Sequence, residues 1–267
     1  MLLKDRVAIV TGGAKGMGRG IAYKLADEGC AVAIADIDMK EAGITVKEIE
    51  KKGGKALAIQ CDVTKEAQAK AVVDQVVARF GTLDILVNNA GGERMSPPIE
   101  LMTEDHWNKT MDLNLKSVFF FCKYAVPLMK AKKYGKIVNI SSMGAICPPA
   151  HVIDYNTAKA AILGFTIDLA GGLASFGINV NALLPGPVVS HFYDGMTANL
   201  NEQQKADFFV NLGKKVPLQR IGLPEDVGNA VVFMASEMGS WVTGQQLNIS
   251  GGLPMQLITP RNLPPTK

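Results

Sequence analysis

VAIVTGGAKGMG, residues 7–18, is an apolar, β-branched run followed by a glycine-rich loop. The run is typical of a buried strand, and the glycines let the backbone turn tightly where a helix begins. In such a unit the helix N-terminus can bind a pyrophosphate. The spacing Gly-x3-Gly-x-Gly departs from the common G-x-G-x-x-G pattern. We expect the loop to form part of a cofactor site through Gly12, Lys15, Gly16, Met17 and Gly18.

Six further apolar runs follow along the chain, and amphipathic stretches separate them. The seven predicted strands are residues 7–11, 31–36, 56–60, 85–88, 136–141, 179–184 and 246–250. Continuous rather than alternating apolar runs are typical of a parallel sheet that is buried on both faces. We therefore predict an α/β fold with one doubly wound, Rossmann-type domain over residues 1–267. Its seven-stranded parallel sheet carries helices on both faces.

Two segments interrupt this alternation. Residues 186–217 form a long excursion before the helix that opens at Pro224, and such excursions within a compact domain are commonly lids or binding loops. We expect residues 190–216 to form a mobile substrate lid, with Phe192 and Met196 among the apolar side chains that close the pocket. The tail, residues 253–267, contains four prolines, which exclude a continuous helix and predict an extended chain.

The composition is that of a globular protein, since 48% of the 267 residues are hydrophobic and 20% are charged. Lys and Arg total 28 against 25 Asp and Glu, and the basic residues are scattered, which predicts no nucleic-acid partner. The four cysteines form no CxxC pair, so we expect neither a metal site nor a disulfide framework. The N-terminus lacks the apolar region of a secretory signal, and Lys123 interrupts the apolar run of residues 119–121, so we expect a soluble, cytoplasmic protein.

An acidic residue ends the second predicted strand. Asp36 follows Gly18 by 18 residues, a position where a carboxylate can accept hydrogen bonds from an adenosine ribose. The same carboxylate would repel a 2′-phosphate, and the adjacent Ile37 supplies no compensating cation. Lys15 acts in the opposite direction, because its ammonium can reach toward a 2′-phosphate. We give Asp36 more weight and predict a preference for NAD over NADP.

Tyr155 and Lys159 are four residues apart in a segment, 154–176, that is predicted to be helical. Their side chains therefore lie on one face of the helix. An ammonium near a phenol favours the phenolate, and lowering a tyrosine pKa from about 10 toward neutrality requires roughly 3 to 4 kcal/mol. The pair is suited to proton transfer near neutral pH.

From Val7 to about Gly252 the sequence resembles the short-chain dehydrogenase/reductase family. Seven motifs occur in the order that the family shows. They are the loop of residues 11–18, Asp62-Val63, Asn88-Asn89-Ala90-Gly91, Asn114, Ser141-Ser142, Tyr155-Asn156-Thr157-Ala158-Lys159 and Pro185-Gly186.

The resemblance implies a role for each of these residues. Tyr155 would be the general acid/base, and Ser142, 13 residues before it, would hold the substrate oxygen. Lys159 would bind the nicotinamide ribose and lower the Tyr155 pKa, and Asn114 would anchor a water in a proton relay. The further implied cofactor contacts are Asp62, Val63, Asn89, Ala90, Gly91, Pro185, Gly186, Val188 and Ser190.

The implied function is NAD(H)-dependent interconversion of a secondary alcohol and a ketone. The implied assembly is a homotetramer with the helices of Asn114 and Tyr155 at one interface. One alternative is an NADPH-dependent reductase of 3-oxoacyl thioesters, which shares every motif except the acid at Asp36. Another is a non-catalytic dinucleotide sensor, but a sensor has no need of the intact set Asn114, Ser142, Tyr155 and Lys159.

Overall fold

All seven strands belong to one sheet in the computed structural model, which describes residues 1–92, 96–149, 152–190 and 193–254. The strands are β1 (Val7–Thr11), β2 (Ala31–Asp36), β3 (Lys55–Gln60), β4 (Ile85–Asn88), β5 (Gly135–Ile140), β6 (Ile178–Pro185) and β7 (Gln246–Ile249). They lie in the order β3-β2-β1-β4-β5-β6-β7, and each neighbouring pair is parallel. The predicted α/β fold is confirmed, and each predicted strand end lies within one residue of the observed end.

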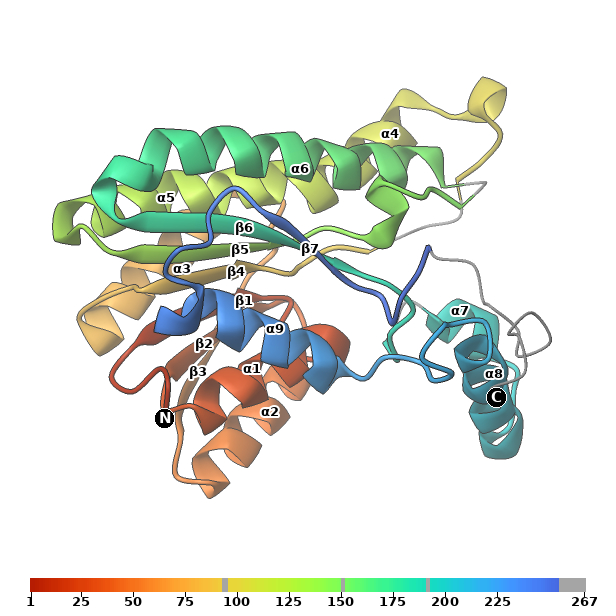
Figure 1. Ribbon diagram of the computed structural model, residues 1–267, viewed down its shortest axis with the longest axis horizontal. Coiled ribbons are helices and arrows are strands. Elements are labelled where there is room, and N and C mark those ends of the chain that lie inside the picture. Colours follow the sequence, from red (N-terminus) through yellow and green to blue (C-terminus); the bar gives the residue numbers. More distant parts are fainter. Residues whose placement is uncertain (93–95, 150–151, 191–192, 255–267) are drawn as a thin grey trace, which may run out of the picture.

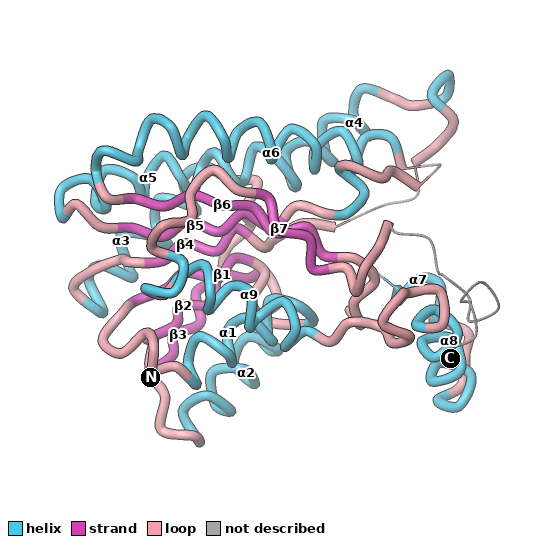
Figure 2. Tube along the Cα trace, in the orientation of Figure 1, coloured by secondary structure: helices cyan, strands magenta, loops and turns pink. Residues whose placement is uncertain are grey.

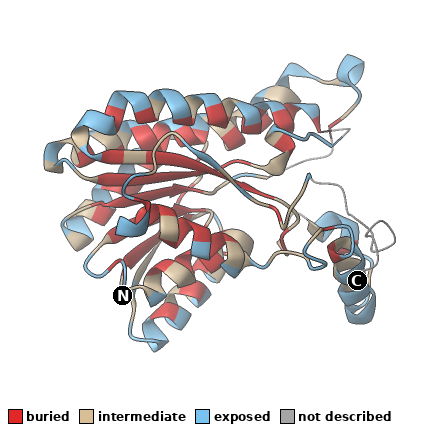
Figure 3. Ribbon diagram, viewed as in Figure 1, coloured by how far each residue is buried: buried red, intermediate tan, exposed pale blue. Residues whose placement is uncertain are grey.

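Helices cover both faces of the sheet (Figure 1). One face packs against α3 (Glu66–Phe80), α5 (Ser117–Lys132) and α6 (Ile153–Leu173), and the other against α1 (Gly16–Asp27), α2 (Met39–Lys51) and α9 (Pro224–Ala235). In β1, Val7 and Ile9 face the first layer while Ala8 and Val10 face the second, as the two-residue period of a strand requires. Figure 3 shows the resulting core, with buried strands between helices whose outer faces are exposed.

The strand order changes direction beside β1. Strands β2 and β3 are added on one side of β1, and β4 to β7 on the other. Open α/β sheets bind their ligands at this switch point, beyond the carboxyl ends of the strands. The glycine-rich loop follows β1 and Asn89 follows β4, so the fold places both predicted motifs at this edge.

The excursion after β6 is largely helical. It contains α7 (Asp194–Thr197) and α8 (Glu202–Gly213), which lie outside the layers of the main body (Figures 1 and 2). The rings of Tyr193, Phe208 and Phe209 contact one another with centroids 5.3 to 5.8 Å apart, which binds the two helices into one unit. The sequence predicts a lid here but not these helices. The predicted contact of Phe192 and the predicted extension of the tail beyond Pro254 lie outside the described residues.

Helix α6 is apolar along most of its length. With its 3₁₀ continuation it spans Ile153–Phe176, which by length and composition alone could cross a membrane, at a mean hydropathy of 1.3. In the structure this helix packs on β6 and buries Asp154 and Lys159 within the chain. We interpret it as a helix of the folded core, since buried charged groups of this kind belong to a protein interior with specific partners.

Candidate active site

A cavity of about 810 Å³ lies at the switch point. The predicted cofactor residues that line it are Gly12, Lys15, Gly16, Met17, Gly18, Asp36, Ile37, Asp62, Val63, Asn89, Ala90, Gly91, Tyr155, Lys159 and Ser190. Pro185, Gly186, Val188, Asn114 and Ser142 are not among its lining residues. The lining also includes Asp38, Cys61, Gly92, Leu113 and Ser141, which the sequence analysis did not assign to the cofactor site.

The glycine-rich loop is packed so closely that side chains would disrupt it. Gly12 and Gly16 have φ values of +63° and +51°, in the left-handed region that favours glycine. A Cβ atom on Gly18 would lie 2.0 Å from the carbonyl oxygen of Gly12. The loop therefore presents bare backbone at the N-terminus of α1, and this cradle fits the pyrophosphate of a dinucleotide.

Hydrogen bonds tie this loop to the turn after β4. The Thr11 Oγ1 accepts from the backbone N–H groups of Asn89 and Ala90, at 3.0 and 2.9 Å. In return, the Asn89 Nδ2 donates to the carbonyl oxygens of Thr11 and Gly12. The Asn89 side chain thus holds the backbone of the glycine-rich loop in place beside the cavity.

Asp36 is held at the cavity rim by backbone donors. Its carboxylate accepts from the N–H groups of Ala14 and Asp38, both at 2.9 Å. The Lys15 ammonium, in turn, lies 2.7 Å from the Asp38 Oδ2. This ion pair raises the pKa of Lys15 and lowers that of Asp38. Asp38 was not predicted as a site residue. Its sequence signal was its position just before a helix, where it accepts a capping hydrogen bond from the N–H of Glu41.

Lys159 lines the cavity, and its side chain is almost fully buried. Its Nζ donates to the carbonyl oxygen of Ile140 at 2.9 Å and lies 5.6 Å from the centroid of the Tyr155 ring. Burial disfavours the ammonium and lowers the pKa of Lys159 to about 8. The structure thus brings the two predicted members of the Tyr-x3-Lys pair together at the cavity.

The two adjacent serines have different contacts. The buried Ser141 hydroxyl donates to the backbone carbonyl of Lys159 at 2.7 Å, which anchors helix α6 to the end of β5. The Ser142 Oγ instead accepts from the N–H of Gly144 at 3.0 Å. Ser141 lines the cavity and Ser142 does not, so the choice of Ser142, made on spacing, as the serine that meets substrate stays a prediction.

Asn114 is fully buried in a π-helical turn, Asp112–Lys116, between α4 (Glu104–Met111) and α5. Its Nδ2 donates to the carbonyl oxygens of Gly92 and Thr110, and its Oδ1 accepts from the N–H of Gly92. A Cβ atom on Gly91 would lie 2.7 Å from the Asn114 Oδ1 and 3.1 Å from the Lys159 Nζ. Asn114 therefore holds the loop after β4 beside Lys159, while its role in anchoring a water stays a prediction.

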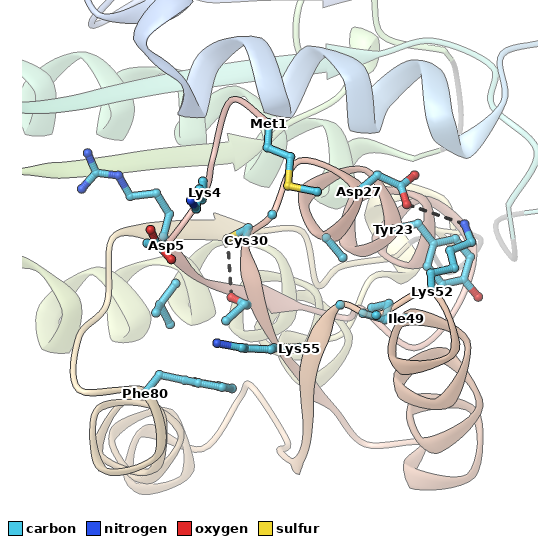
Figure 4. Close-up of a pocket in the computed structure, with 17 residues that line it drawn as sticks. Met1, Lys4, Asp5, Tyr23, Asp27, Cys30, Ile49, Lys52, Lys55 and Phe80 are labelled. Atoms are coloured by element: carbon cyan, nitrogen blue, oxygen red, sulfur yellow. Dashed lines mark hydrogen bonds and ion pairs between the residues drawn. The ribbon is translucent and has the colours of Figure 1, made fainter.

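A second cavity, of about 460 Å³, contains basic side chains and a thiol (Figure 4). The Lys52 ammonium there lies 3.6 Å from the Asp27 carboxylate. The Cys30 thiol is buried, donates to the carbonyl oxygen of Ala31 and has its pKa raised by burial. A protonated, buried thiol is a poor nucleophile, so we assign no chemistry to this cavity. Over the described ranges, moreover, no cluster of three or more His, Cys, Asp or Glu side chains could hold a metal ion.

The comparisons with known proteins agree with this geometry. A family model described as enoyl-(acyl carrier protein) reductase matches residues 12–254. The chain belongs to the short-chain dehydrogenase/reductase family. It is thereby an oxidoreductase of a family that uses a nicotinamide dinucleotide, and the family assignment made from the sequence motifs is confirmed.

Three relatives illustrate the range of this family. The chain is 40% identical over 250 residues to a 3-oxoacyl-[acyl-carrier-protein] reductase of Staphylococcus aureus, covering 93% of this chain and 98% of that protein. It is 37% identical to a 4-formylbenzenesulfonate dehydrogenase of Comamonas testosteroni, covering 94% and 99%. The crystal structure of a levodione reductase superposes with a TM-score of 0.87 at 29% identity, covering 94% of this chain and 98% of that one.

Proposed function

We propose that this protein interconverts a secondary alcohol and a ketone by hydride transfer to or from NAD(H). The observation that carries the proposal is the buried Lys159 ammonium, 5.6 Å from the centroid of the Tyr155 ring, where both residues line a cavity that the glycine-rich loop also lines. The glycine-rich loop would hold the pyrophosphate, and Asp36 the adenosine ribose. By family resemblance, Asp62 and Val63 would contact the adenine, and Val188 and Ser190 the carboxamide.

When bound, the nicotinamide would accept or supply the hydride. In alcohol oxidation, the Tyr155 phenolate takes the hydroxyl proton of the substrate, and in ketone reduction the phenol returns a proton to the carbonyl oxygen. The Lys159 ammonium stabilises the phenolate and so lowers the cost of forming it near neutral pH. The Ser142 hydroxyl donates a hydrogen bond to the substrate oxygen, whose negative charge changes during the reaction.

A second candidate is the NADPH-dependent reduction of a 3-oxoacyl thioester. The S. aureus relative is a 3-oxoacyl-[acyl-carrier-protein] reductase, which supports a thioester substrate at least as well as a simple ketone. The two candidates share the proton-transfer residues and differ in substrate and cofactor. A substrate panel separates them: acetoacetyl-CoA, levodione, 4-formylbenzenesulfonate and simple cyclic ketones, each with NADH and with NADPH. Faster reduction of acetoacetyl-CoA with NADPH than of any substrate with NADH would establish the second candidate.

We expect the wild-type protein to prefer NAD(H) by about 100-fold in kcat/KM, because a 2′-phosphate placed near Asp36 meets a like charge at a cost of several kcal/mol. The Lys15 ammonium does not offset this charge, because it is paired with Asp38. Replacing Asp38 by Asn keeps a good helix cap and releases Lys15. We expect Asp38→Asn to strengthen NADPH binding about tenfold relative to NADH, as measured by fluorescence titration.

The matched control is Lys15→Ala in the Asp38→Asn background, which should remove the gain in NADPH binding. Tighter binding of NADPH than of NADH by the wild-type protein would overturn the proposed cofactor preference. If Asp38→Asn leaves the ratio of NADPH to NADH affinity unchanged, the Lys15–Asp38 ion pair does not determine the cofactor preference.

The helical unit of α7 and α8 carries the predicted lid. Met196 of α7 lines the cavity while 55% of it is exposed, so its side chain can be shortened without opening the core. We expect Met196→Ala to raise KM for the substrate about 3- to 10-fold, through about 1 kcal/mol of lost apolar contact, and to leave the NADH affinity unchanged. Val210→Ala is the control, since Val210 is exposed on α8 and is not a cavity-lining residue. A large fall in thermal stability of Met196→Ala would show that the segment is core rather than lid.

We further propose that the protein is a cytoplasmic homotetramer without a nucleic-acid or membrane partner. Phe119 on α5 and Ile167 on α6 expose 46% and 50% of their surface, which supports a subunit contact on this helical layer. Light scattering of the purified protein tests the tetramer.

A further inference from the structure

A buried carboxylate directly precedes the predicted catalytic tyrosine. Asp154 is fully buried at the start of α6. The Ser96 hydroxyl donates to its Oδ1, and the Thr110 hydroxyl donates to its Oδ2 at 2.7 Å. The Nε2 of His106 lies 3.1 Å from the same Oδ2 without the alignment of a hydrogen bond. The Asp154 carboxylate, at the start of α6, therefore contacts two other segments of the chain, α4 and the loop after β4.

Removing a carboxylate from water costs free energy, and this cost must be offset by hydrogen bonds or charges around the buried group. Burial alone would raise the pKa of Asp154, but the hydrogen bonds from Ser96, Thr110 and the backbone N–H of Tyr155, together with the charge of His106, outweigh it and hold the pKa below its usual value. The carboxylate is thus charged at neutral pH. A charged acceptor binds hydroxyl donors more strongly than a neutral one and holds them at short distances.

The contacts of Asp154 continue into the active site. Thr110, whose hydroxyl reaches Asp154, also accepts through its backbone carbonyl from the Asn114 side chain. Asn114 in turn holds both the N–H and the carbonyl of Gly92, which lines the cavity. The loop after β4 is therefore fastened at Gly92 by Asn114 and at Ser96 by Asp154.

We propose that Asp154 is a positioning residue, whose buried carboxylate joins α6, α4 and the loop after β4 and so fixes the Tyr155 hydroxyl relative to bound substrate. The proposal rests on the proposed function, because it assumes that Tyr155 transfers a proton. Its physical basis is geometric: a displacement of about 1 Å between reacting groups can lower a rate about 100-fold.

The test is Asp154→Asn in the full-length protein, assayed with NADH and the fastest substrate of the panel, beginning with acetoacetyl-CoA. Turnover is expressed per NADH-binding site, counted by titration, so that unfolded protein does not contribute. We expect kcat per site to fall about 30- to 100-fold, with the NADH Kd within threefold and KM changed less than kcat. Asp112→Asn is the control, since Asp112 forms a surface pair with Lys116 and should leave kcat within twofold.

A purely structural role predicts a different result, namely a lower melting temperature with an unchanged kcat per NADH-binding site, and that result would overturn the proposal. If Asp154→Asn does not fold, Thr110→Val is the second variant. It removes one hydroxyl donor to Asp154 but keeps the side-chain shape at position 110 and the Asp154 carboxylate itself. We expect this variant to lower kcat per site about 3- to 10-fold, and an unchanged value would again refute the positioning role. A wild-type protein that binds NADH but reduces no substrate refutes the proposed function instead, before any variant is compared.

Discussion

Tyr155→Phe is expected to lower kcat about 10³- to 10⁴-fold while the protein keeps its fold and its NADH affinity. The change removes one hydroxyl and leaves the ring, so the packing beside Lys159 is retained. General acid/base assistance contributes about 10² to 10⁴ in rate. We expect the upper part of that range, because Lys159 is assigned to stabilise the phenolate of Tyr155 and Ser142 to hold the substrate oxygen with which Tyr155 exchanges its proton. The measurement is steady-state turnover in parallel with an NADH titration.

Tyr124→Phe provides the matched control. The hydroxyl of Tyr124, on α5, donates to Glu66 at the start of α3, and neither residue lines the cavity, so loss of this hydroxyl should leave kcat within twofold. A Tyr155→Phe variant with wild-type turnover would contradict the mechanism, and one that no longer binds NADH would show a structural rather than a chemical role for the hydroxyl.

Lys159→Met is expected to abolish measurable turnover and to weaken NADH binding, because one ammonium is assigned both to the ribose and to the phenolate. We expect at least a 10³-fold loss in kcat/KM. Lys136→Met is a suitable control: Lys136 is also a buried lysine, on β5, but its Nζ donates to Asn179 and it is not among the cavity-lining residues. Retained turnover in Lys159→Met would contradict its assigned role.

The same substitution should stabilise the protein in the absence of cofactor. Burial lowers the pKa of Lys159 from 10.5 to about 8, so the folded protein holds this proton less tightly than the unfolded chain does. The buried ammonium therefore lowers the free energy of unfolding. This loss has its full size below pH 8 and disappears as the pH rises toward 10.5. Its upper limit is about 3 kcal/mol, and loss of the hydrogen bond to Ile140 offsets part of the gain.

We thus expect Lys159→Met to raise the free energy of unfolding by about 1 to 2 kcal/mol at pH 7, with a difference from wild type that narrows between pH 8 and pH 10.5. Thermal unfolding of both proteins across this pH range provides the measurement. If Lys159→Met is less stable than wild type at pH 7, the Lys159 ammonium stabilises the folded protein, which would contradict this expectation.

The sequence was sufficient to predict the sheet because its central strands are largely apolar and buried, whereas the edge strand β7, Gln-Leu-Asn-Ile, alternates. The motifs could also be placed, since Thr11 ends β1 and Asn89 follows β4, at carboxyl ends that meet at one edge of the sheet. Tyr155 lies near the start of α6, the helix that follows β5. The seven-stranded parallel fold and the family could be predicted from these local signals, because strands and motifs are formed by residues that are close together in the sequence.

Contacts between distant segments were not predictable in the same way. The pairing of Lys15 with Asp38 depends on how the glycine loop folds over the end of β2, and sequence analysis therefore left Lys15 as a competing cation. The contacts of Asp154 with Ser96 and Thr110 join residues 58 and 44 positions apart. Helices α7 and α8 were missed because their polar sequence lacks the apolar stripe of a core helix. Their stability comes partly from the aromatic contacts of Tyr193 with Phe208 and Phe209.

The central claim is that this chain moves a hydride between NAD(H) and a carbonyl carbon, with Tyr155 transferring the proton. The most direct test is the change in NADH absorbance when wild-type protein meets the carbonyl panel and the corresponding alcohols. We predict NADH oxidation with at least one ketone or 3-oxoacyl thioester, faster than with NADPH, and NADH formation from the matching alcohol. Saturable binding of NADH without reaction across the whole panel would contradict the claim and favour a dinucleotide sensor.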